Sequence, residues 1–589
     1  MPTYAELKAR ADKQWQDLTA GDRPWIRVGT ALCGQAAGGV EVVEALKKTA
    51  EAKGIKVTVD EVGCIGMCYA EPLVDIQKPG ESRLFFKNVS ADDVPALLES
   101  YLVKNQIPTG KVFGYLGAKP IAGAPNIADM PQWKLQNRIA LRNAGTTAPD
   151  DIFQYIANNG FAALNKALTE MKPADVIQQM IDSGLRGRGG AAFPTGTKWS
   201  FLVKNTSPVK YILCNCEEGD PGAYNDKGIL ESDPYTLVEG LLLAGYATGS
   251  SNGIIFVRHG HDGPIDRAEM AVKQAYENGL LGKNILGTSF TFNIEVALTG
   301  DSYVAGEETA LMEAIEGHRS MPRSRPPFPA AFGVWGKPSN INNVKSLSYA
   351  PEIILKGAQW FSSIGVNKSK GTAIVCLSGA IKYPGWYEIP MGLSLSQVIN
   401  VIGGGPPSGK KVKLLQTGGP LGGVLDANSL NIKIDFEEMS AAGAILGSGG
   451  IIIADEDTCA VDLTRVLVAF CQYESCGKCF PCRLGMTHLL EFVERITKLE
   501  GRPADLAMME SVGKNMQAGS LCGHGQLGFN PIRSALKFFG SDFKMHIEQK
   551  KCPTGSCGKP IISPRNTRPY AEMARDDRQP IQVASKASK

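Results

Sequence analysis

Three cysteines at regular spacing are the most chemically specific feature of the sequence. Residues 476–482 read CGKCFPC, so Cys476, Cys479 and Cys482 follow a C-x-x-C-x-x-C pattern. Thiolates on one tight turn suit three irons of a [4Fe-4S] cluster, and Cys522, in the segment GSLCG, is the candidate fourth ligand. A zinc knuckle could use the same cysteines, but zinc sites usually draw two ligands from each of two knuckles. We therefore predict a [4Fe-4S] cluster.

A glycine-rich segment is the second chemical feature. Residues 183–196 read SGLRGRGGAAFPTG. Dense glycines let backbone N–H groups close on a phosphate at a helix start, and Arg186 and Arg188 would add positive charge. The segment is not the G-x-G-x-x-G fingerprint that follows a strand. On its own it fits a phosphate-binding loop and a plain mobile loop equally well.

Polar residues near this loop strengthen the phosphate-binding interpretation. Lys198 follows closely and offers a point charge for a phosphate or a flavin edge. The strand expected at residues 211–214 is followed by Asn215, Glu217, Glu218 and Asp220. Ligands bind at the carboxyl ends of strands in doubly wound sheets. These groups suit sugar hydroxyls and the edge of an amide ring, and the alternative is a solvated acidic loop.

The C-terminal region carries a second group of candidate metal ligands. His546, Cys552 and Cys557 are close to ligand spacing, and Cys459 lies unpaired in the preceding helical region. Together they could form a closed, structural Cys₃His zinc site. Two alternatives stay open, namely a remnant of a ferredoxin segment and incidental cysteines.

Three cysteines near the N-terminus accompany two expected strands, at residues 25–29 and 55–59. Cys33 follows the first strand, and Cys64 and Cys68 follow the second. These stretches resemble the thioredoxin-like [2Fe-2S] ferredoxin domain, which normally supplies four cysteines. Ala37 and Gly38 stand where the second cysteine is expected. Two interpretations stay open: a [2Fe-2S] cluster with a non-cysteine fourth ligand, or a domain without a cluster that is kept for docking.

The bulk composition describes an ordinary globular protein of several domains. The chain has 589 residues, 43% hydrophobic and 21% charged, with a net charge of +3. This balance gives no electrostatic case for binding nucleic acid or an anionic membrane. The 14 cysteines are clustered, which argues for metal ligation in a reducing compartment, and we expect a cytoplasmic protein. The start lacks the pattern of a secretory signal, and we expect no membrane span.

Six motifs in order resemble a known family. They lie at residues 184–196, 215–222, 306–309, 325–329, 340–344 and 475–483. Together they resemble the FMN- and NADH-binding flavoprotein subunit of respiratory complex I, and its soluble relatives in NAD-reducing hydrogenases and NAD-linked formate dehydrogenases. The resemblance covers roughly residues 150–540. With the added N-terminal domain, the chain most resembles the large diaphorase subunit of multimeric, often electron-bifurcating, iron hydrogenases.

The resemblance implies an α/β multidomain fold with a thioredoxin-like domain, a Rossmann-like domain, a β-grasp insert and a helical bundle. The expected parts are a leader helix (1–22), the thioredoxin-like domain (23–104), a linker (105–150), the FMN/NADH-binding α/β domain (151–368), the ubiquitin-like β-grasp insert (369–455), the bundle with the [4Fe-4S] cluster (456–545) and a tail with the zinc candidate (546–589).

The resemblance also implies the cofactor contacts. The positions that match FMN-holding ones are Gly187, Gly189, Gly190, Lys198, Asn215, Glu217, Tyr303, Gly306, Glu307, Asn342 and Asn343. The positions that match NADH-holding ones are Phe193, Phe201, Asp220, Glu308, Arg325 and Phe328. Phenyl rings can stack on adenine and nicotinamide, and a carboxylate can accept from ribose hydroxyls. We expect Asp220 and Glu308 to orient NADH, and Lys198 to stabilise the reduced, anionic flavin.

Some positions depart from the usual family pattern. Glu217 and Asp220 exchange Asp for Glu in opposite directions. Arg325 stands where Lys is usual, and Lys345 where an acid is common. These changes affect the ribose contacts and the cofactor affinity, while the redox chemistry itself belongs to the cofactors.

The function implied is an oxidoreductase that passes electrons from NADH through FMN to a [4Fe-4S] cluster and on to partners. The implied partners are a small thioredoxin-like [2Fe-2S] subunit and a catalytic iron–sulfur subunit of the hydrogenase or formate dehydrogenase type. The competing hypothesis is a docking and electron-relay subunit without NADH turnover. A third, the membrane complex I subunit itself, is disfavoured by roughly 150 extra residues in front of the shared region.

Overall fold

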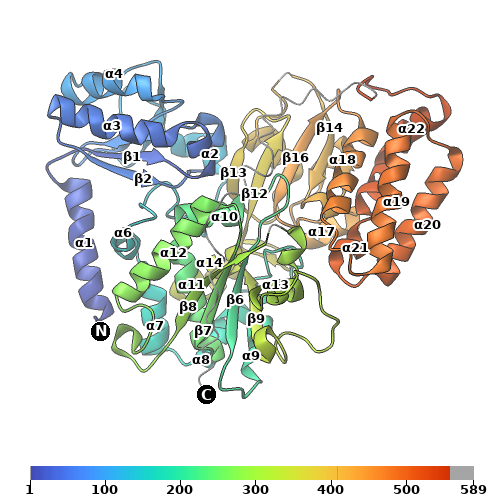
Figure 1. Ribbon diagram of the computed structural model, residues 1–589. Helices are drawn as coiled ribbons and strands as arrows, with labels where there is room; N and C mark the ends of the chain where they lie inside the picture. The colour runs from blue at the N-terminus through green and yellow to red at the C-terminus, as the bar shows by residue number, and fades with distance from the viewer. Residues whose placement is uncertain (1, 301, 408, 558–589) are drawn as a thin grey trace.

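The computed structural model describes residues 2–300, 302–407 and 409–557 (Figure 1). The tail expected at residues 546–589 is therefore described only as far as Cys557, and the rest of it lies outside the described residues. Among the described helices, none combines the length and the apolar character that crossing a bilayer requires.

The N-terminal region folds around a five-stranded sheet of order β2-β1-β3-β4-β5, in which only β1 and β2 are parallel. Helix α3 packs its apolar side (Val42, Leu46) on this sheet and ends at Gly54, which adopts the left-handed conformation that glycine favours. The elements are α1 (Tyr4–Ala20), β1 (Trp25–Gly29), α2 (Leu32–Ala36), α3 (Gly39–Lys53), β2 (Thr58–Val62), β3 (Val74–Gln77), β4 (Arg83–Phe86), α4 (Val94–Leu98), β5 (Val112–Leu116) and α5 (Pro131–Lys134).

Two expectations for this region need correction. The strand expected at residues 55–59 begins only at Thr58, because its parallel pairing with β1 starts opposite Trp25. The interval 105–150, expected to be a linker, contributes β5 to the sheet. Its high content of Pro, Gly and Asn concealed this short strand, which pairs with β4 over residues 83–86.

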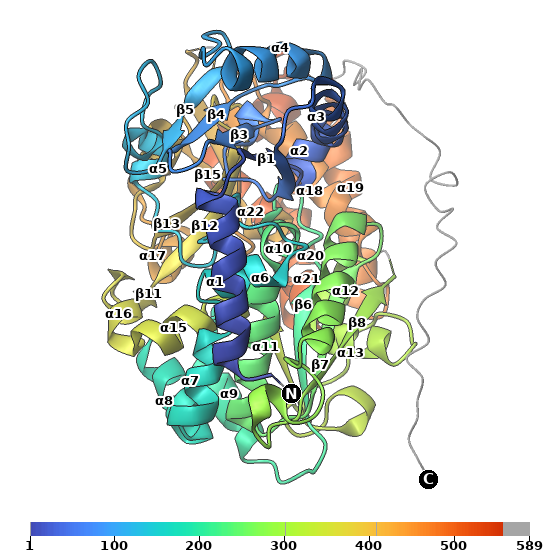
Figure 2. The ribbon, with the colours of Figure 1, turned by 90° about the vertical axis from the view of Figure 1, so that its left-hand side faces the viewer.

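Helix α1, which precedes the N-terminal sheet in the chain, extends away from that sheet and packs along the next domain (Figures 1 and 2). Its buried residues Leu7 and Ala11 belong to the same core cluster as Phe153 of helix α6 (Ile152–Ala157). The Arg10 guanidinium lies 3.9 Å from the centre of the Phe153 ring. Trp15 contacts the sheet side, edge-on to Trp25. The helix therefore ties the N-terminal domain to the domain that follows.

A parallel sheet of order β8-β7-β6-β9 forms the centre of the molecule. Its strands are apolar on both faces because helices cover both sides, as is usual for parallel sheets. Ile212 and Cys214 face the cluster that contains α11, whereas Leu213 faces the cluster that contains α13. The strands are β6 (Tyr211–Cys216), β7 (Asn252–Arg258), β8 (Asn293–Thr299) and β9 (Ser339–Asn343).

Helices surround this sheet, and α11 is almost wholly buried because its sequence is apolar on every side. The helices after α6 are α7 (Ala162–Glu170), α8 (Pro173–Asp182), α9 (Thr195–Val203), α10 (Asn225–Ser232), α11 (Pro234–Thr248), α12 (Asp262–Glu277), α13 (Glu308–Ile315), α14 (Val344–Ser348), α15 (Ala350–Lys356) and α16 (Ala358–Ser362).

A mixed five-stranded sheet of order β13-β12-β16-β14-β15 follows. It has a core of its own, in which Val375 and Ile453 take part. Residues of the opposite face, such as Cys376 and Leu414, pack on the flanking domains. Its strands are β12 (Thr372–Gly379), β13 (Gly385–Pro390), β14 (Val412–Thr417), β15 (Val424–Asp426) and β16 (Gly450–Asp455), with helix α17 (Phe436–Ala442) before β16. Strands β10 (Gly365–Val366) and β11 (Ser369–Lys370) precede it and pair with each other as a separate two-stranded sheet.

A helical bundle closes the described chain and lies on the far side of the mixed sheet from the N-terminal domain (Figure 1). It is held by a shared apolar cluster that includes Leu489, Val493 and Phe543. Its helices are α18 (Ala460–Tyr473), α19 (Phe480–Thr497), α20 (Pro503–Gly519), α21 (Gly523–Leu527) and α22 (Asn530–Glu548). The α/β multidomain architecture with a helical C-terminal region agrees with the sequence prediction.

Candidate functional site

A cavity of about 1030 Å³ opens at the carboxyl ends of the central parallel strands. Asn215, the last residue but one of β6, lies beside Asn343 at the end of β9, because the two positions are paired in the strand register. Both asparagines line the cavity, as does the start of the glycine-rich segment at Gly187. The polar residues predicted at strand ends therefore meet the glycine-rich loop, as ligand sites in such sheets do.

Most of the residues predicted to contact cofactors line this cavity. From the FMN set these are Gly187, Gly189, Lys198, Asn215, Gly306, Glu307, Asn342 and Asn343. From the NADH set they are Phe193, Phe201, Glu308, Arg325 and Phe328. Helix α9 begins at Thr195 directly after the glycine-rich loop and carries Lys198 and Phe201. The sequence reasoning missed Thr195, which lies within the glycine-rich segment, and Lys204, Asn205 and Ser346, which belong to no motif; all four line the cavity.

Backbone and side-chain hydrogen bonds hold the polar wall of the cavity rigid. Asn215 Nδ2 donates to the Gly306 carbonyl oxygen at 2.8 Å, which fixes the turn before α13. Glu307 caps α13, because its Oε2 accepts from the backbone N–H of Thr309 and of Ala310, each at 2.9 Å. The Asn343 amide donates to Asp226 at 2.6 Å. Such fixed donors and acceptors preorganise a site for a polar cofactor.

Three aromatic rings give the cavity an apolar slot. Phe193 and Phe201 have their ring centres 6.1 Å apart, and their side chains are 45% and 44% exposed. Phe328 is 60% exposed on the same cavity. Apolar rings left open to solvent at the mouth of a cavity indicate a ligand surface. Their spacing and shape suit the stacking of a planar heterocycle.

Charged side chains gather at the same mouth around Glu308. Its carboxylate lies 2.5 Å from the Arg325 guanidinium and 3.6 Å from Lys198 Nζ. Burial lowers the pKa of Lys198, and the Glu308 charge opposes that shift. A carboxylate held in place between two cations can accept hydrogen bonds from ribose hydroxyls.

Four residues predicted to contact the cofactors do not line the cavity, namely Gly190, Glu217, Asp220 and Tyr303. Glu217 is buried beside Arg258, and burial raises the pKa of Glu217 to about 8 although Arg258 opposes the shift. Asp220 accepts a hydrogen bond of 2.7 Å from the Tyr303 hydroxyl and lies against Gly419 of the mixed sheet. Gly190 is also absent from the lining. Direct cofactor contact by these residues stays a prediction.

Two arginines of the glycine-rich loop point elsewhere, which corrects the expectation that they add charge for a phosphate. The Arg188 guanidinium is buried and donates to the carbonyl oxygens of Thr372 and Lys370. Arg186 pairs with Glu437 of helix α17 at 2.5 Å. Both residues therefore fasten the loop to the mixed sheet domain, and the anion-binding groups left at the loop are its backbone and Lys198.

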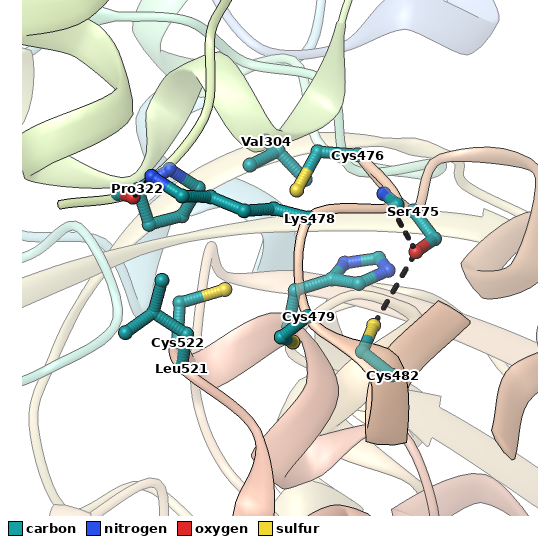
Figure 3. Close-up of a pocket in the computed structure, with 11 residues that line it drawn as sticks. Val304, Pro322, Ser475, Cys476, Lys478, Cys479, Cys482, Leu521 and Cys522 are labelled. Carbon is teal, nitrogen blue, oxygen red and sulfur yellow. Dashed lines mark hydrogen bonds between the residues drawn. The ribbon is translucent and has the colours of Figure 1, made fainter. Parts of the chain in front are cut away.

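The four cysteines predicted for the [4Fe-4S] cluster face one small cavity (Figure 3). Cys476 and Cys479 lie on the turn into α19, Cys482 lies in the first turn of that helix, and Cys522 lies on the turn between α20 and α21. Ser475 Oγ is 3.4 Å from Cys482 Sγ, and Lys478 Nζ donates to the Pro322 carbonyl oxygen at 2.6 Å. Four thiols around one space match the ligand chemistry of a [4Fe-4S] cluster.

His524 also lines the cluster cavity, and no cysteine pattern signals it. Its Nε2 is 2.8 Å from the Cys471 carbonyl oxygen, and burial lowers its pKa. Its Nδ1 has no hydrogen-bond partner among the described residues. The ring also stands 5.7 Å from the ring of Tyr303, which links the cluster bundle to the flavin side.

The tail constellation converges as predicted. One ligand atom from each of Cys459, His546, Cys552 and Cys557 lies within 4.8 Å of the others. His546 Nε2 is 3.5 Å from Cys459 Sγ and 3.4 Å from Cys557 Sγ, while its Nδ1 is 2.7 Å from the Asp542 carbonyl oxygen. That carbonyl fixes the orientation of the ring, as the hydrogen-bond partners of ligating histidines do in zinc sites. The donor set suits tetrahedral zinc, and its occupancy stays a prediction.

The three N-terminal thiols also lie together. The Cys68 thiol interacts with the thiols of Cys33 and Cys64, and this interaction is the main cause of the lowered pKa of both. The Gly66 N–H lies 3.2 Å from Cys64 Sγ. These cysteines face α10 and β13, since Leu32 N donates to Glu231 at 2.9 Å and Trp386 N donates to Gly66 at 3.1 Å.

Family models match three parts of the chain. They are the Nuo51 FMN-binding domain at residues 180–352, the SLBB domain at 374–425 and the NADH-ubiquinone oxidoreductase-F iron–sulfur binding region at 462–546. The first covers the cavity of the central sheet, and the last covers the four cluster cysteines.

Similar proteins cover most of the chain. The NADP-reducing hydrogenase subunit HndC of Solidesulfovibrio fructosivorans is 45% identical over 72% of this chain and 86% of its own length. The F 2 subunit of the NADH-quinone oxidoreductase of Rhizobium meliloti is 41% identical over 70% of this chain and 99% of its own. A chain of an NAD⁺-reducing [NiFe]-hydrogenase aligns with a TM-score of 0.62 and 27% identity, over 93% of this chain and 88% of that one.

These matches confirm the resemblance drawn from the motifs and the cofactors inferred from it. The protein is an NAD-linked oxidoreductase subunit with FMN, NAD(H) and a [4Fe-4S] cluster as its cofactors. The chain belongs to the family of the F subunits of NADH-quinone oxidoreductases, which includes the corresponding flavoprotein subunits of hydrogenases.

Proposed function

We propose that this chain is the diaphorase subunit of a cytoplasmic, multisubunit hydrogenase. It transfers hydride between NAD(H) and FMN and passes electrons singly to its [4Fe-4S] cluster and on to partner subunits. The hydrogenase assignment is supported by the likeness to HndC and to the NAD⁺-reducing [NiFe]-hydrogenase. The cytoplasmic assignment is supported by its clustered free thiols.

One observation carries the electron path. Val304 lines the cluster cavity, while Gly306 and Glu307 line the large cavity. Two residues of chain span at most about 7 Å, so one short turn separates the two sites. The same turn is tied to the bundle, because the Tyr303 N–H donates to Glu474 at 3.0 Å. A cofactor in the large cavity would thus lie next to the cluster.

Each side chain at the mouth has a defined task in this proposal. The rings of Phe193, Phe201 and Phe328 stack on the heterocycles of NADH and keep water off them. Glu308 accepts from a ribose hydroxyl, and Lys198 places positive charge near the flavin edge. Bound FMN supplies the exchange between two-electron and one-electron transfer. Asp220 is a positioning residue that acts through Tyr303, since the two are hydrogen-bonded.

Anaerobic addition of NADH to the FMN-loaded full chain tests the proposal. We expect the flavin absorbance to bleach within the mixing time and the [4Fe-4S] cluster to become reduced. Absence of bleaching in a sample with full FMN content would instead identify a docking and electron-relay subunit. The variant Phe201→Ala should bleach at a higher NADH concentration, which ties the signal to this cavity.

The partner is tested by isolating the complex under anaerobic conditions. Mass spectrometry should identify a small thioredoxin-like [2Fe-2S] subunit and a hydrogenase-type iron–sulfur subunit. A formate dehydrogenase subunit in that position would assign the chain to the other soluble class of the family. Reduction of ferredoxin together with NAD⁺ by the whole complex would establish bifurcation.

A further inference from the structure

The N-terminal domain brings three thiols near one another, one fewer than a [2Fe-2S] cluster needs. Cys33, Cys64 and Cys68 lie together, yet a [2Fe-2S] cluster needs four protein ligands. The position of the expected fourth cysteine offers no replacement, because Ala37 is exposed and Gly38 has no side chain. Any further ligand must come from elsewhere in the fold.

Glu71 is placed to complete the set. Its side chain is buried, and its Oε2 accepts a hydrogen bond of 2.7 Å from the Leu73 N–H. Its Oε1 has no hydrogen-bond partner among the described residues. The carboxyl group lies beside the Cys64 thiol and close to Cys33. A buried carboxylate oxygen without a partner is costly unless a ligand or a proton satisfies it.

The backbone leaves room for this carboxylate by means of two glycines. A Cβ atom on Gly29 would stand 2.7 Å from Glu71 Oε2 and 2.9 Å from Oε1. A Cβ atom on Gly34, the residue after Cys33, would stand 3.5 Å from Oε2. The carboxylate is thus lodged between the end of β1 and the turn that carries Cys33, on the side where the thiols meet.

We propose that Glu71 is the fourth ligand of a [2Fe-2S] cluster held by Cys33, Cys64 and Cys68. Iron binds carboxylate oxygen as well as sulfur, and non-cysteine ligands occur in other [2Fe-2S] proteins. The cluster would lie against α10 and β13 and so face the flavin domain and the mixed sheet.

Glu231 of α10 is the nearest competitor and serves as the matched control. It is also buried and close to Cys33, and its Oε2 accepts from the Leu32 N–H at 2.9 Å, as Glu71 Oε2 does from the Leu73 N–H. Unlike Glu71, it has no buried oxygen that lacks a hydrogen-bond partner among the described residues. Its carboxylate belongs to the neighbouring domain, and its charge acts on the Cys33 thiol. A ligand role for Glu71 therefore predicts that the two glutamates respond differently to substitution.

Iron and sulfide content of the full chain, expressed with iron and purified anaerobically, tests the proposal together with EPR of the reduced protein. The wild type should hold about six irons per chain, four in the [4Fe-4S] cluster and two in the N-terminal site. Glu71→Gln should hold about four and lose the [2Fe-2S] signal. Glu71→Cys should keep about six with shifted g-values, and Glu231→Gln should keep about six with the wild-type signal.

Several outcomes would overturn the assignment. They are a wild type with only four irons, a Glu71→Gln variant with an unchanged [2Fe-2S] signal, and loss of that signal in Glu231→Gln. Loss in Glu71→Cys as well as in Glu71→Gln would assign Glu71 a packing role. The [4Fe-4S] signal in every sample reports on folding of the rest of the chain, so misfolding is recognised separately.

Discussion

At the scale of single residues, the cavity mouth depends on how one carboxylate is shared. Glu308 faces both Lys198 and Arg325, so a single carboxylate pairs with two cations at a partly buried site. Neighbouring Glu307 has a different task, because one of its oxygens caps α13. Both acids line the cavity, but Glu307 also holds the start of α13, while Glu308 makes the shorter contact with Arg325.

Glu308→Gln should raise the KM for NADH about tenfold, which corresponds to about 1.4 kcal/mol of lost binding. The amide keeps the size of the side chain but removes the charge that pairs with Lys198 and Arg325. Steady-state kinetics with an artificial electron acceptor would measure the KM for NADH. Glu313→Gln, on the same helix but paired with Arg323, is the control. A KM equal to that of the wild type would rule out a role for Glu308 in binding NADH.

Buried Glu217 should make the stability depend on pH. Burial raises its pKa to about 8, above the value of 4.5 for a free glutamate. The folded state therefore holds this proton more tightly, and stability should fall as pH rises from about 4.5 to about 8. Thermal unfolding of the wild type and of Glu217→Gln across this range should show a shallower decline for the variant. Parallel curves would contradict the raised pKa.

At the scale of elements, loops and helix ends bring distant residues together. Cys459 immediately precedes helix α18, and α22 carries His546 in its last turn. The segment after α22 returns Cys552 and Cys557 to the same point. A metal there would bridge both ends of the bundle and reinforce its apolar core.

Cys459→Ser should lower the zinc content from about one ion per chain to none and lower the unfolding temperature of the bundle by about 5 °C. Elemental analysis and calorimetry are the measurements. Cys471→Ala removes another buried cysteine of α18 that lies outside the zinc group, and it should retain the metal. Wild-type protein that contains no zinc after purification without chelators would disprove the site.

At the scale of the whole molecule, the large cavity and the cluster cavity share one wall. The turn of residues 303–307 reaches from one to the other, and the rings of Tyr303, Phe470 and His524 pack across the boundary between the flavin domain and the bundle. In the proposed function, hydride transfer therefore takes place in the large cavity and one-electron transfer in the cluster cavity, and the turn of residues 303–307 lies between them.

Cys522→Ala should therefore separate the two halves of the reaction. The variant should lose the [4Fe-4S] signal and at least about 90% of electron transfer to the partner subunit, because its cluster has only three cysteine ligands. Bleaching of the flavin by NADH should persist. Cys471→Ala, whose side chain is buried beside the cluster but does not line its cavity, is the control. Unimpaired transfer in Cys522→Ala would remove the cluster from the electron path.

The sequence by itself determined the features that depend on neighbouring residues. The C-x-x-C-x-x-C spacing, the glycine-rich loop and the order of the six motifs indicated the family and its cofactors. Residues that are close in the sequence can adopt few relative positions, so the spacing of ligands on a turn indicates which kind of metal site they can form. The same reasoning located the strands expected at residues 25–29 and 211–214, because a run of strand-forming residues is a local signal.

Only the tertiary structure decided which side chains reach each site. Asp220 lies behind the cavity wall against Gly419, and the loop arginines bind the mixed sheet, because residues some 200 positions away occupy the remaining space. β5 joined the N-terminal sheet because β4 offered an unpaired edge. Glu71 meets Cys33 only through the pairing of β1 with β3. Such contacts depend on packing between distant segments, which local sequence patterns do not encode.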